Sequence, residues 1–226
     1  MGSYQEYPKE GKLKDNMNLT LSELLNKLRN QQELIYAYVI RTVQYKNNKL
    51  LQRGCGPNFE GGLITLCTCK HYMRTWRDVP AWKGMWVAGF TRFNLIDDKK
   101  NYLFYLMKVR EAFSSHSRIW NFLDCEARTA KNARGNPLGD VYEPRKKIED
   151  QFDYLNYHTP VENHVHATEN LWHEDINYTN WYGKRPALLV GDLEHSFLWF
   201  LPIIRFEGKH PRTKIWQMKE FKSAIS

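Results

Sequence analysis

The chain has 226 residues, a length typical of one domain. Its 42% hydrophobic and 26% charged residues are typical of a folded globular protein and exclude wholesale disorder. Lys and Arg outnumber Asp and Glu by 33 to 25, and this net charge of +8, together with 14% aromatic residues, favours a nucleic-acid or nucleotide partner.

The first segment of the chain is polar and mixed in charge. We predict a flexible tail over residues 1–17 and a single domain over residues 18–226. No apolar signal core lies near the start of the chain. The longest apolar run, residues 197–204, contains Pro202 and is too short to cross roughly 30 Å of hydrocarbon. We therefore expect a cytoplasmic protein without membrane contacts.

Hydrophobic periodicity predicts the elements in chain order. Leucines at helical spacing predict a helix over residues 19–34. Runs of β-branched and aromatic residues predict strands over residues 34–43, 63–69, 84–90, 102–109, 187–191 and 197–201. A hairpin connection is expected over residues 97–101, short helices over 117–123 and 213–221, and mainly loop over 124–160.

Irregular strand spacing, with helices between the strands and at the ends, predicts an α+β domain. We expect a curved mixed sheet or a small β-barrel with flanking helices. Strand and helix do not alternate regularly, and no Gly-x-Gly-x-x-Gly motif occurs, which argues against a dinucleotide-binding fold.

The four cysteines are too few for a disulfide-stapled fold of this length. Cys67, Cys69 and His71 are spaced like metal ligands, but structural zinc sites generally need four. Residues two apart on a strand also share one face, which explains the spacing without a metal. We predict neither a metal nor a cofactor.

A glycine-rich loop over residues 53–62 contains four glycines and a proline. Such a loop lets backbone N–H groups approach a ligand closely. Arg53, Lys70 and Arg74 are expected to converge there on a phosphate or a carbonyl edge. A plain connecting loop with solvated charges is the alternative.

Tryptophans and cations are interleaved in the next segment. Trp76, Trp82 and Trp86 lie near Lys70 and Arg74 in the sequence. Indole rings stack on bases and cations hold phosphates, so this set predicts a pocket for one flipped base. A core position is the alternative, above all for Trp86, which lies on a predicted strand.

Two later segments also carry polar chemistry. In residues 131–140, Lys131 supplies charge, Asn132 can read a base edge and Asp140 supplies a carboxylate, although a flexible polar loop explains them equally well. Further on lie the histidines His158, His164, His166, His173 and His195. His173, Asp175, His195 and Arg205 follow the ligand order of iron- and 2-oxoglutarate-dependent dioxygenases, but with a shorter spacing than is usual there.

A family resemblance rests on several short motifs taken together. They are Gly56-Pro57-Asn58, Thr65-Leu66, Cys69-Lys70, Arg74, and Trp-Lys-Gly-Met-Trp-Val-Ala-Gly at residues 82–89. Their order resembles the second of the nucleotide-modification-associated domain families of bacteria and phages. An aromatic strand, a helix with Trp120 and a later Gly139-Asp140 fit as well, so the resemblance spans about residues 34–206. The chain departs from the pattern at His71, where a proline is expected, and at Gly84-Met85, where Gly-Asp is usual.

That resemblance implies a link to modified DNA bases, and hence to DNA modification or phage defence. The strand pattern is also similar to the small barrels of the pseudouridine-synthase-and-archaeosine-transglycosylase-like (PUA-like) superfamily. Its EVE and YTH domains hold a modified base in an aromatic pocket, a likeness at the level of fold.

These observations lead to a first hypothesis and two rivals. The first is a module that binds a modified or flipped nucleobase, with DNA the favoured partner. The expected base contacts are Tyr38, Asn58, Trp82, Trp86 and Asn132. The expected phosphate contacts are Arg53, Lys70, Arg74 and Lys131, with Cys69, Asp140 and His164 as further pocket residues.

The rivals differ in what the pocket does. One is an enzyme acting on a nucleotide or modified base, with Asp140, Cys69 or a histidine as acid or base, and with a metal in one variant. The other is a structural partner whose basic face meets another protein of a modification, restriction or defence system.

Overall fold

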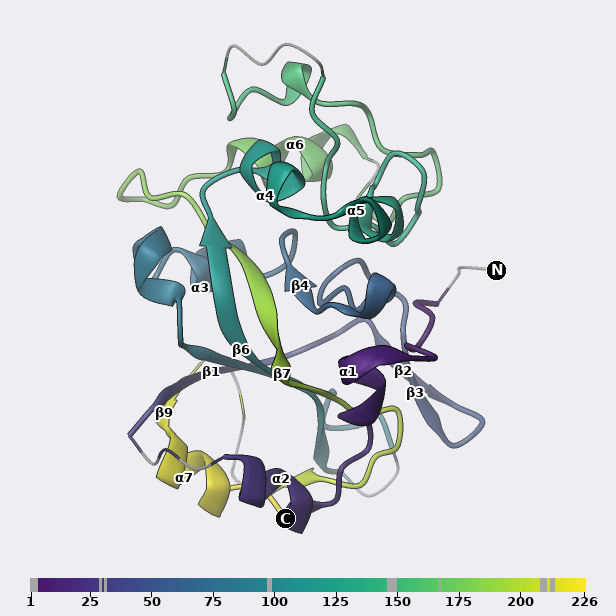
Figure 1. Ribbon diagram of the computed structural model, residues 1–226, viewed down its shortest axis with the longest axis vertical. Helices are drawn as coiled ribbons and strands as arrows, with labels where there is room; N and C mark the ends of the chain where they lie inside the picture. The colour runs from purple at the N-terminus through teal and green to yellow at the C-terminus, as the bar shows by residue number, and fades with distance from the viewer. Residues whose placement is uncertain are drawn as a thin grey trace.

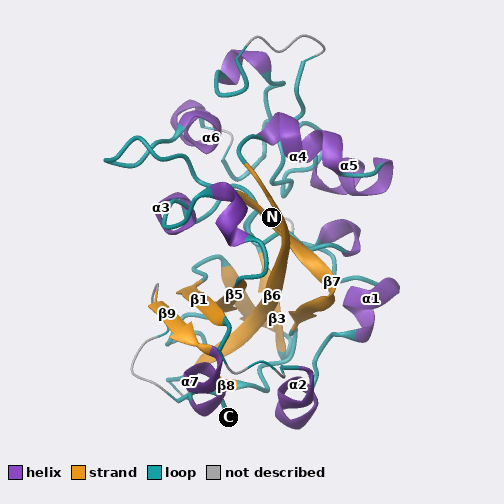
Figure 2. Cartoon of the chain, turned by 60° about the vertical axis from the view of Figure 1, so that its left-hand side comes forward, coloured by secondary structure: helices purple, strands orange, loops and turns teal. Residues whose placement is uncertain are grey.

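The computed structural model describes residues 4–28, 30, 32–96, 99–145, 150–166, 168–207, 211 and 214–226. Its centre is a strongly curled sheet that forms half of a barrel, with helices at both ends (Figures 1 and 2). This is the α+β architecture around a curved sheet that the sequence predicts. None of the described helices is long and apolar enough to cross a membrane.

The main sheet has the strand order β4-β7-β6-β5-β1-β9. Its strands are β1 (Leu34–Val39), β4 (Thr65–Leu66), β5 (Trp86–Phe90), β6 (Asn101–Phe113), β7 (Leu188–Leu198) and β9 (Lys214–Gln217), and β8 (Arg205–Phe206) pairs with the start of β6. Strands β1 and β5 are parallel, and the other pairs are antiparallel. Register shifts along β6 against β5 and β7 mark bulges, which increase twist and help the sheet to curl.

A separate hairpin joins β2 (Val43–Lys46) to β3 (Lys49–Gln52). Its two turn residues, Asn47 and Asn48, both have positive φ, the conformation that a two-residue type I′ turn requires. Asparagine tolerates this region better than most residues, so the local sequence explains the turn.

Most of the described helices lie at the two ends of the curled sheet. Near one end lie α2 (Leu21–Lys27) and α7 (Met218–Ser223), and near the other lie α3 (His71–Arg74), α4 (His116–Phe122), α5 (Cys125–Lys131) and α6 (Glu169–Asn177), whereas α1 (Gly11–Asp15) lies beside β7 at the side of the sheet, as Figure 1 shows. Short 3-10 turns span Glu60–Gly62, Val79–Trp82 and Tyr154–Asn156. The second group of helices surrounds the candidate site described below.

The core has two principal clusters, one on each face of the sheet. Along β1, Tyr36 and Tyr38 belong to one cluster, whereas Ile35 and Ala37 belong to the other. This alternation follows from the two-residue period of a strand. The two clusters matter for function because they separate aromatic residues that are close neighbours in sequence.

Several elements differ from the sequence-based expectation. The strand predicted over residues 63–69 is reduced to β4, and the two predicted over 187–201 form the single strand β7. The expected loop over 124–160 contains α5, whose N-cap Asp124 accepts a hydrogen bond from the backbone N–H of Ala127. The segment predicted as a flexible tail contains α1 and the buried residues Gln5 and Leu13. Of the expected hairpin connection, Asp97 and Asp98 lie outside the described residues.

Candidate active site

Two cysteines meet where the glycine-rich loop passes the start of α3. Cys69 follows β4, and Lys70 begins α3 from a left-handed conformation. Gly56 lies against this thiol: a Cβ added there would lie 3.1 Å from both the Cβ and the Sγ of Cys69. The glycine therefore allows the loop to bring Cys55 against Cys69.

An imidazole joins the two thiols. The Sγ atoms of Cys55 and Cys69 and a ring nitrogen of His166 all lie within 4.8 Å of one another. Cys55 is buried, whereas Cys69 and His166 are partly exposed. Of the two thiols, Cys69 is thus the one that solvent can reach.

A buried carboxylate orients the imidazole. Asp175, on α6, places its Oδ2 atom 2.8 Å from Nδ1 of His166. Because Nδ1 faces the carboxylate, Nε2 is the ring atom left to accept a proton. A thiol, an imidazole and an orienting carboxylate in this order form the arrangement of a general-base-activated nucleophile.

Two further groups hold the Asp175 carboxylate. Its Oδ1 atom lies 2.8 Å from Nε2 of His71, and its Oδ2 accepts a hydrogen bond of 2.7 Å from the Tyr142 hydroxyl. Burial alone would raise the pKa of Asp175, but the bonds from His166 and His71 outweigh it and lower the pKa to about 2. Asp175 is therefore ionised at neutral pH and presents a fixed negative charge.

The electrostatics favour a thiolate at Cys69. The hydrogen bond from Cys55 is the largest influence and, with the charge of His166, lowers the pKa of Cys69 to about 7. The same bond and burial raise the pKa of Cys55 well above its ordinary value. Burial opposes a charged ring at His166, but the hydrogen bond and charge of Asp175 outweigh it and raise its pKa. Cys55 is thus the protonated thiol of the pair, and Cys69 is the thiol that ionises more readily.

The same three atoms are of the type that zinc binds. Two cysteines and a histidine are a ligand set of catalytic zinc sites, and a bound metal ion would itself deprotonate both thiols. The same atoms therefore fit either a hydrogen-bonded thiol pair or a Cys2His metal site, and metal analysis of the purified protein distinguishes the two.

His164 and Lys70 are the other predicted residues at this site. Nδ1 of His164 accepts a hydrogen bond from the backbone N–H of His166, and its Nε2 lies 2.8 Å from the carbonyl oxygen of Gly139. The amino group of Lys70 lies 5.2 Å from the centre of the Tyr38 ring, and Tyr38 is buried and accepts a hydrogen bond from the Tyr105 hydroxyl. His164 therefore positions His166, and Lys70 supplies an exposed cation beside Cys69.

Arg74 has a structural position instead of a phosphate-facing one. It is buried, and its guanidinium donates to the carbonyl oxygens of Cys69, Ala187 and Cys67 at 2.8, 2.6 and 2.8 Å. These bonds tie the start of α3 to β4 and to the segment before β7. Arg74 thereby fixes the backbone that carries the Cys69 thiol.

The two tryptophans predicted as pocket walls lie in different core clusters. Trp82 is 0% exposed, and its indole N–H donates to the carbonyl oxygen of Arg74. Trp86 is 2% exposed and donates to the carboxylate of Glu33 from the other cluster. The sheet separates the two rings, so they do not share one cavity.

The predicted polar residues of the later loop form a buried support. The Lys131 amine donates to the carbonyl oxygens of Asn58 and Leu63, and Asn58 donates in turn to the carbonyl oxygen of Leu138. Asp140 accepts from the Thr65 hydroxyl and the backbone N–H of Cys67. Burial raises the pKa of Asp140 to about 6.

Asn132 and Arg53 lie nearer the surface. The side-chain amide of Asn132 donates to the Glu143 carboxylate at 2.8 Å. Arg53 is exposed, and its backbone N–H donates to the carbonyl oxygen of Thr42. The structure therefore gathers Cys69, Lys70 and His164 around one site and places the other predicted residues in structural or separate positions.

The dioxygenase-like ligand order does not form a cluster. The imidazoles beside the Asp175 carboxylate belong to His71 and His166. His173 instead stacks on Tyr154 at 3.5 Å, and His195 contacts Asp192. The sequence singled out Asp175 with His173 and His195, whereas the structure places His71 and His166 beside it.

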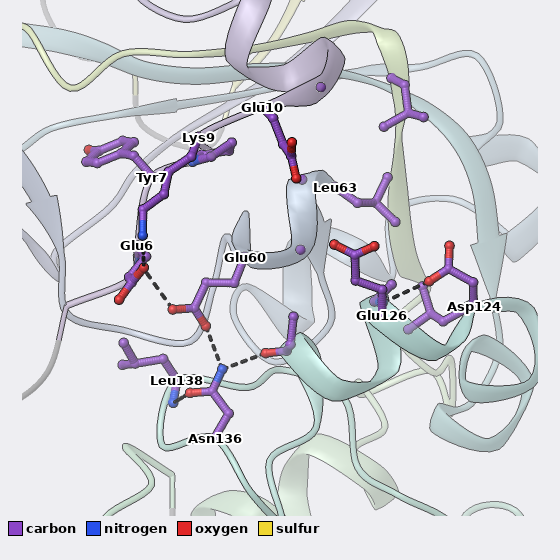
Figure 3. Close-up of a pocket in the computed structure, with 18 of the residues that line it drawn as sticks. Glu6, Tyr7, Lys9, Glu10, Glu60, Leu63, Asp124, Glu126, Asn136 and Leu138 are labelled. Atoms are coloured by element: carbon purple, nitrogen blue, oxygen red, sulfur yellow. Dashed lines mark hydrogen bonds and ion pairs between the residues drawn. The ribbon is translucent and has the colours of Figure 1, made fainter.

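A separate pocket lies between the N-terminal segment and α5 (Figure 3). Its volume is about 1260 Å³. Five carboxylates line it, those of Glu6, Glu10, Glu60, Asp124 and Glu126. Lys9, Lys12 and Arg110 line it as well, so acidic residues outnumber basic ones, and none of the predicted base or phosphate contacts lies in its lining.

No protein-family model, curated protein or solved structure matches this chain. The similarity to the nucleotide-modification-associated family therefore stays a prediction, and the function has to be argued from the site itself.

Proposed function

We propose that the protein is an enzyme that acts on a nucleotide or nucleobase through the thiol of Cys69. The observation that carries the proposal is the convergence of Cys69, His166 and Asp175 from three separate segments of the chain. A buried carboxylate that fixes an imidazole next to a partly exposed thiol is costly to build as a mere structural feature. It is the arrangement that activates a cysteine nucleophile.

The chemistry assigned to each side chain follows from its position. His166 takes the proton of the Cys69 thiol, and Asp175 stabilises the resulting imidazolium and fixes its orientation. The thiolate then attacks an electrophilic carbon of the substrate and forms a C–S bond. The proton held by His166 passes to the atom that receives the displaced electron pair. Attack by water or a second substrate, with His166 again taking a proton, breaks the C–S bond and regenerates the thiol.

Charge around the thiol supports an anionic substrate. Lys70 and Arg41 are exposed, and they lie close enough for the charge of Arg41 to lower the pKa of Lys70, after the larger effect of burial. The whole chain carries a net charge of +8. Cations beside a nucleophile attract and position phosphates, so a nucleotide or polynucleotide is the substrate class that we infer, with DNA favoured.

The binding-module hypothesis gains less support. It needs Trp82 and Trp86 as facing walls of one pocket, and these rings lie buried in separate clusters. A place in a DNA-modification or phage-defence system, with a protein partner from that system, stays a prediction from the resemblance.

Covalent trapping tests the proposal. The protein is incubated with free nucleotides and with oligonucleotides carrying modified or unmodified bases, and intact mass spectrometry records adducts and products. We expect a substrate-derived adduct on Cys69, and a loss of turnover of roughly a hundredfold or more in Cys69→Ala.

Cys125→Ala provides the matched control, because Cys125 is an exposed cysteine outside the site. It should react and turn over as the wild type does. Zinc analysis of the purified protein accompanies the assay. Turnover that survives in Cys69→Ala, or stoichiometric zinc whose removal abolishes activity, would contradict a thiol nucleophile.

A further inference from the structure

The segment that follows α6 exposes two neighbouring aromatic rings. We call residues 178–186 the aromatic loop. Trp181 is 95% exposed and Tyr182 is 84% exposed, the highest values among the large hydrophobic residues that the structure describes. In Figures 1 and 2 this loop projects from the body of the molecule between α6 and α3. Two adjacent rings held in water indicate a binding function more than a packing one.

The tip of the aromatic loop is locally rigid. The Asn180 side-chain oxygen accepts hydrogen bonds from the backbone N–H groups of Tyr182 and Lys184, both at 2.9 Å. The backbone N–H of Asn180 donates to the carbonyl oxygen of Lys184, and Gly183 supplies the positive φ that the turn needs. The rings are therefore presented on a fixed turn, which lowers the entropic cost of binding through them.

The aromatic loop follows α6, the helix that carries Asp175, and also contacts α3. Its first residue, Tyr178, stacks on His71 with ring centres 5.0 Å apart. The Asn180 amide donates to the Thr75 hydroxyl at 2.9 Å. His71 in turn contacts Asp175. The first residue of the loop is therefore linked to the candidate site through one side chain, that of His71.

The surroundings of the rings are cationic. Residues 70–78 and 178–187 together contain five Lys or Arg and a single acidic residue, Asp78. Arg74 is buried, Lys184 pairs with Asp78, and Arg185 is partly buried with its guanidinium 3.9 Å from the centre of the Phe152 ring, whereas Lys70 is exposed. Exposed aromatic rings flanked by cations complement the two features that every nucleic acid offers, flat bases and phosphates.

We propose that the aromatic loop binds single-stranded nucleic acid by stacking Trp181 and Tyr182 on its bases, next to the Cys69 site. A single strand is favoured because its base faces are free to stack, whereas a duplex hides them. This inference rests on the proposed function, because it assumes that the Cys69 site acts on a nucleotide. It adds that the substrate is a polynucleotide instead of a free nucleotide.

Fluorescence anisotropy with a labelled oligothymidylate tests the proposal without any catalytic readout. We expect Trp181→Ala and Tyr182→Ala each to weaken binding roughly tenfold, and Trp181→Phe to retain most of the affinity because a ring remains. Phe93→Ala is the matched control, since Phe93 is an exposed aromatic residue beyond the opposite end of β5.

The outcomes separate the two proposals. Cys125→Ala should bind the oligonucleotide as the wild type does, because this exposed cysteine lies outside both the thiol site and the aromatic loop. Equal affinities for wild type and the Trp181→Ala/Tyr182→Ala double variant would overturn the inference and leave the thiol chemistry standing. A concentration-dependent dimer that the double variant loses would also overturn it, since a second copy of the chain would then be the occupant.

Discussion

Nδ1 of His166 lies 2.8 Å from Oδ2 of Asp175, and this contact decides what Cys69 can do. The carboxylate holds the ring in one orientation and stabilises its positive charge. Without that contact the imidazole would be a partly exposed histidine near a thiol. With it, the imidazole is held in a fixed orientation beside Cys69.

The first prediction concerns the pH dependence of Cys69 alkylation. Because its pKa is lowered to about 7, the rate with iodoacetamide should rise with pH, reach half its maximum near pH 7 and level off above about pH 8. The measurement uses Cys125→Ser protein, which lacks the exposed cysteine outside the site, and peptide mass spectrometry to locate the label. A midpoint near 9, the ordinary value for a thiol, would show that the site leaves Cys69 unactivated.

The second prediction concerns Cys55. Its hydrogen bond is the largest cause of the lowered pKa of Cys69, so Cys55→Ala should move the alkylation midpoint to higher pH. At pH 7 the rate should fall by roughly fivefold, as the thiolate fraction falls. Cys67→Ala is the matched control, because it also removes a buried thiol near Cys69 but not the hydrogen-bond donor. An unchanged midpoint in Cys55→Ala would mean that His166 alone sets the reactivity.

The third prediction concerns Asp175 and stability. Its pKa is about 2 in the folded protein, below the ordinary value of 3.8, so ionised Asp175 stabilises the fold. The lowered pKa contributes about 2 kcal/mol, fully present above about pH 4 and lost as pH falls toward 2. Chemical unfolding of wild type and Asp175→Asn should therefore differ clearly at pH 6 and converge toward pH 2. A difference that is constant over this range would place the stabilisation elsewhere.

The fold was largely predictable because its signals are local. Aromatic and β-branched runs identify β1, β5 and β6, and irregular spacing identifies an α+β sheet. The helix α5 was missed although Asp124 is a good N-cap, because mixed charge in the following residues resembled a loop. Boundaries were set by pairing: β6 and β7 extend further because each supports the other.

The site was only partly predictable because its contacts are distant in sequence. Cys69, Lys70 and His164 were singled out, but nothing local joins Cys69 to His166 or His166 to Asp175. Amino-acid composition also does not distinguish a tryptophan that stacks on a ligand from one that packs in the hydrophobic core. Trp82 and Trp86 are close in sequence yet pack on opposite faces, whereas Trp181, in a short loop, is the exposed ring.

The last prediction separates a structural role of Arg74 from phosphate binding. Arg74→Ala leaves three buried carbonyl oxygens without donors, and each such loss costs about 1–3 kcal/mol. We therefore expect the free energy of unfolding, measured in urea, to fall by at least about 3 kcal/mol.

Lys70→Ala is the contrasting variant. Because Lys70 is exposed, its loss should change stability by less than about 0.5 kcal/mol while weakening oligonucleotide binding and its salt dependence. A stable Arg74→Ala protein that has lost only oligonucleotide affinity would instead assign Arg74 to the ligand, because a buried structural arginine cannot be removed without cost to the fold.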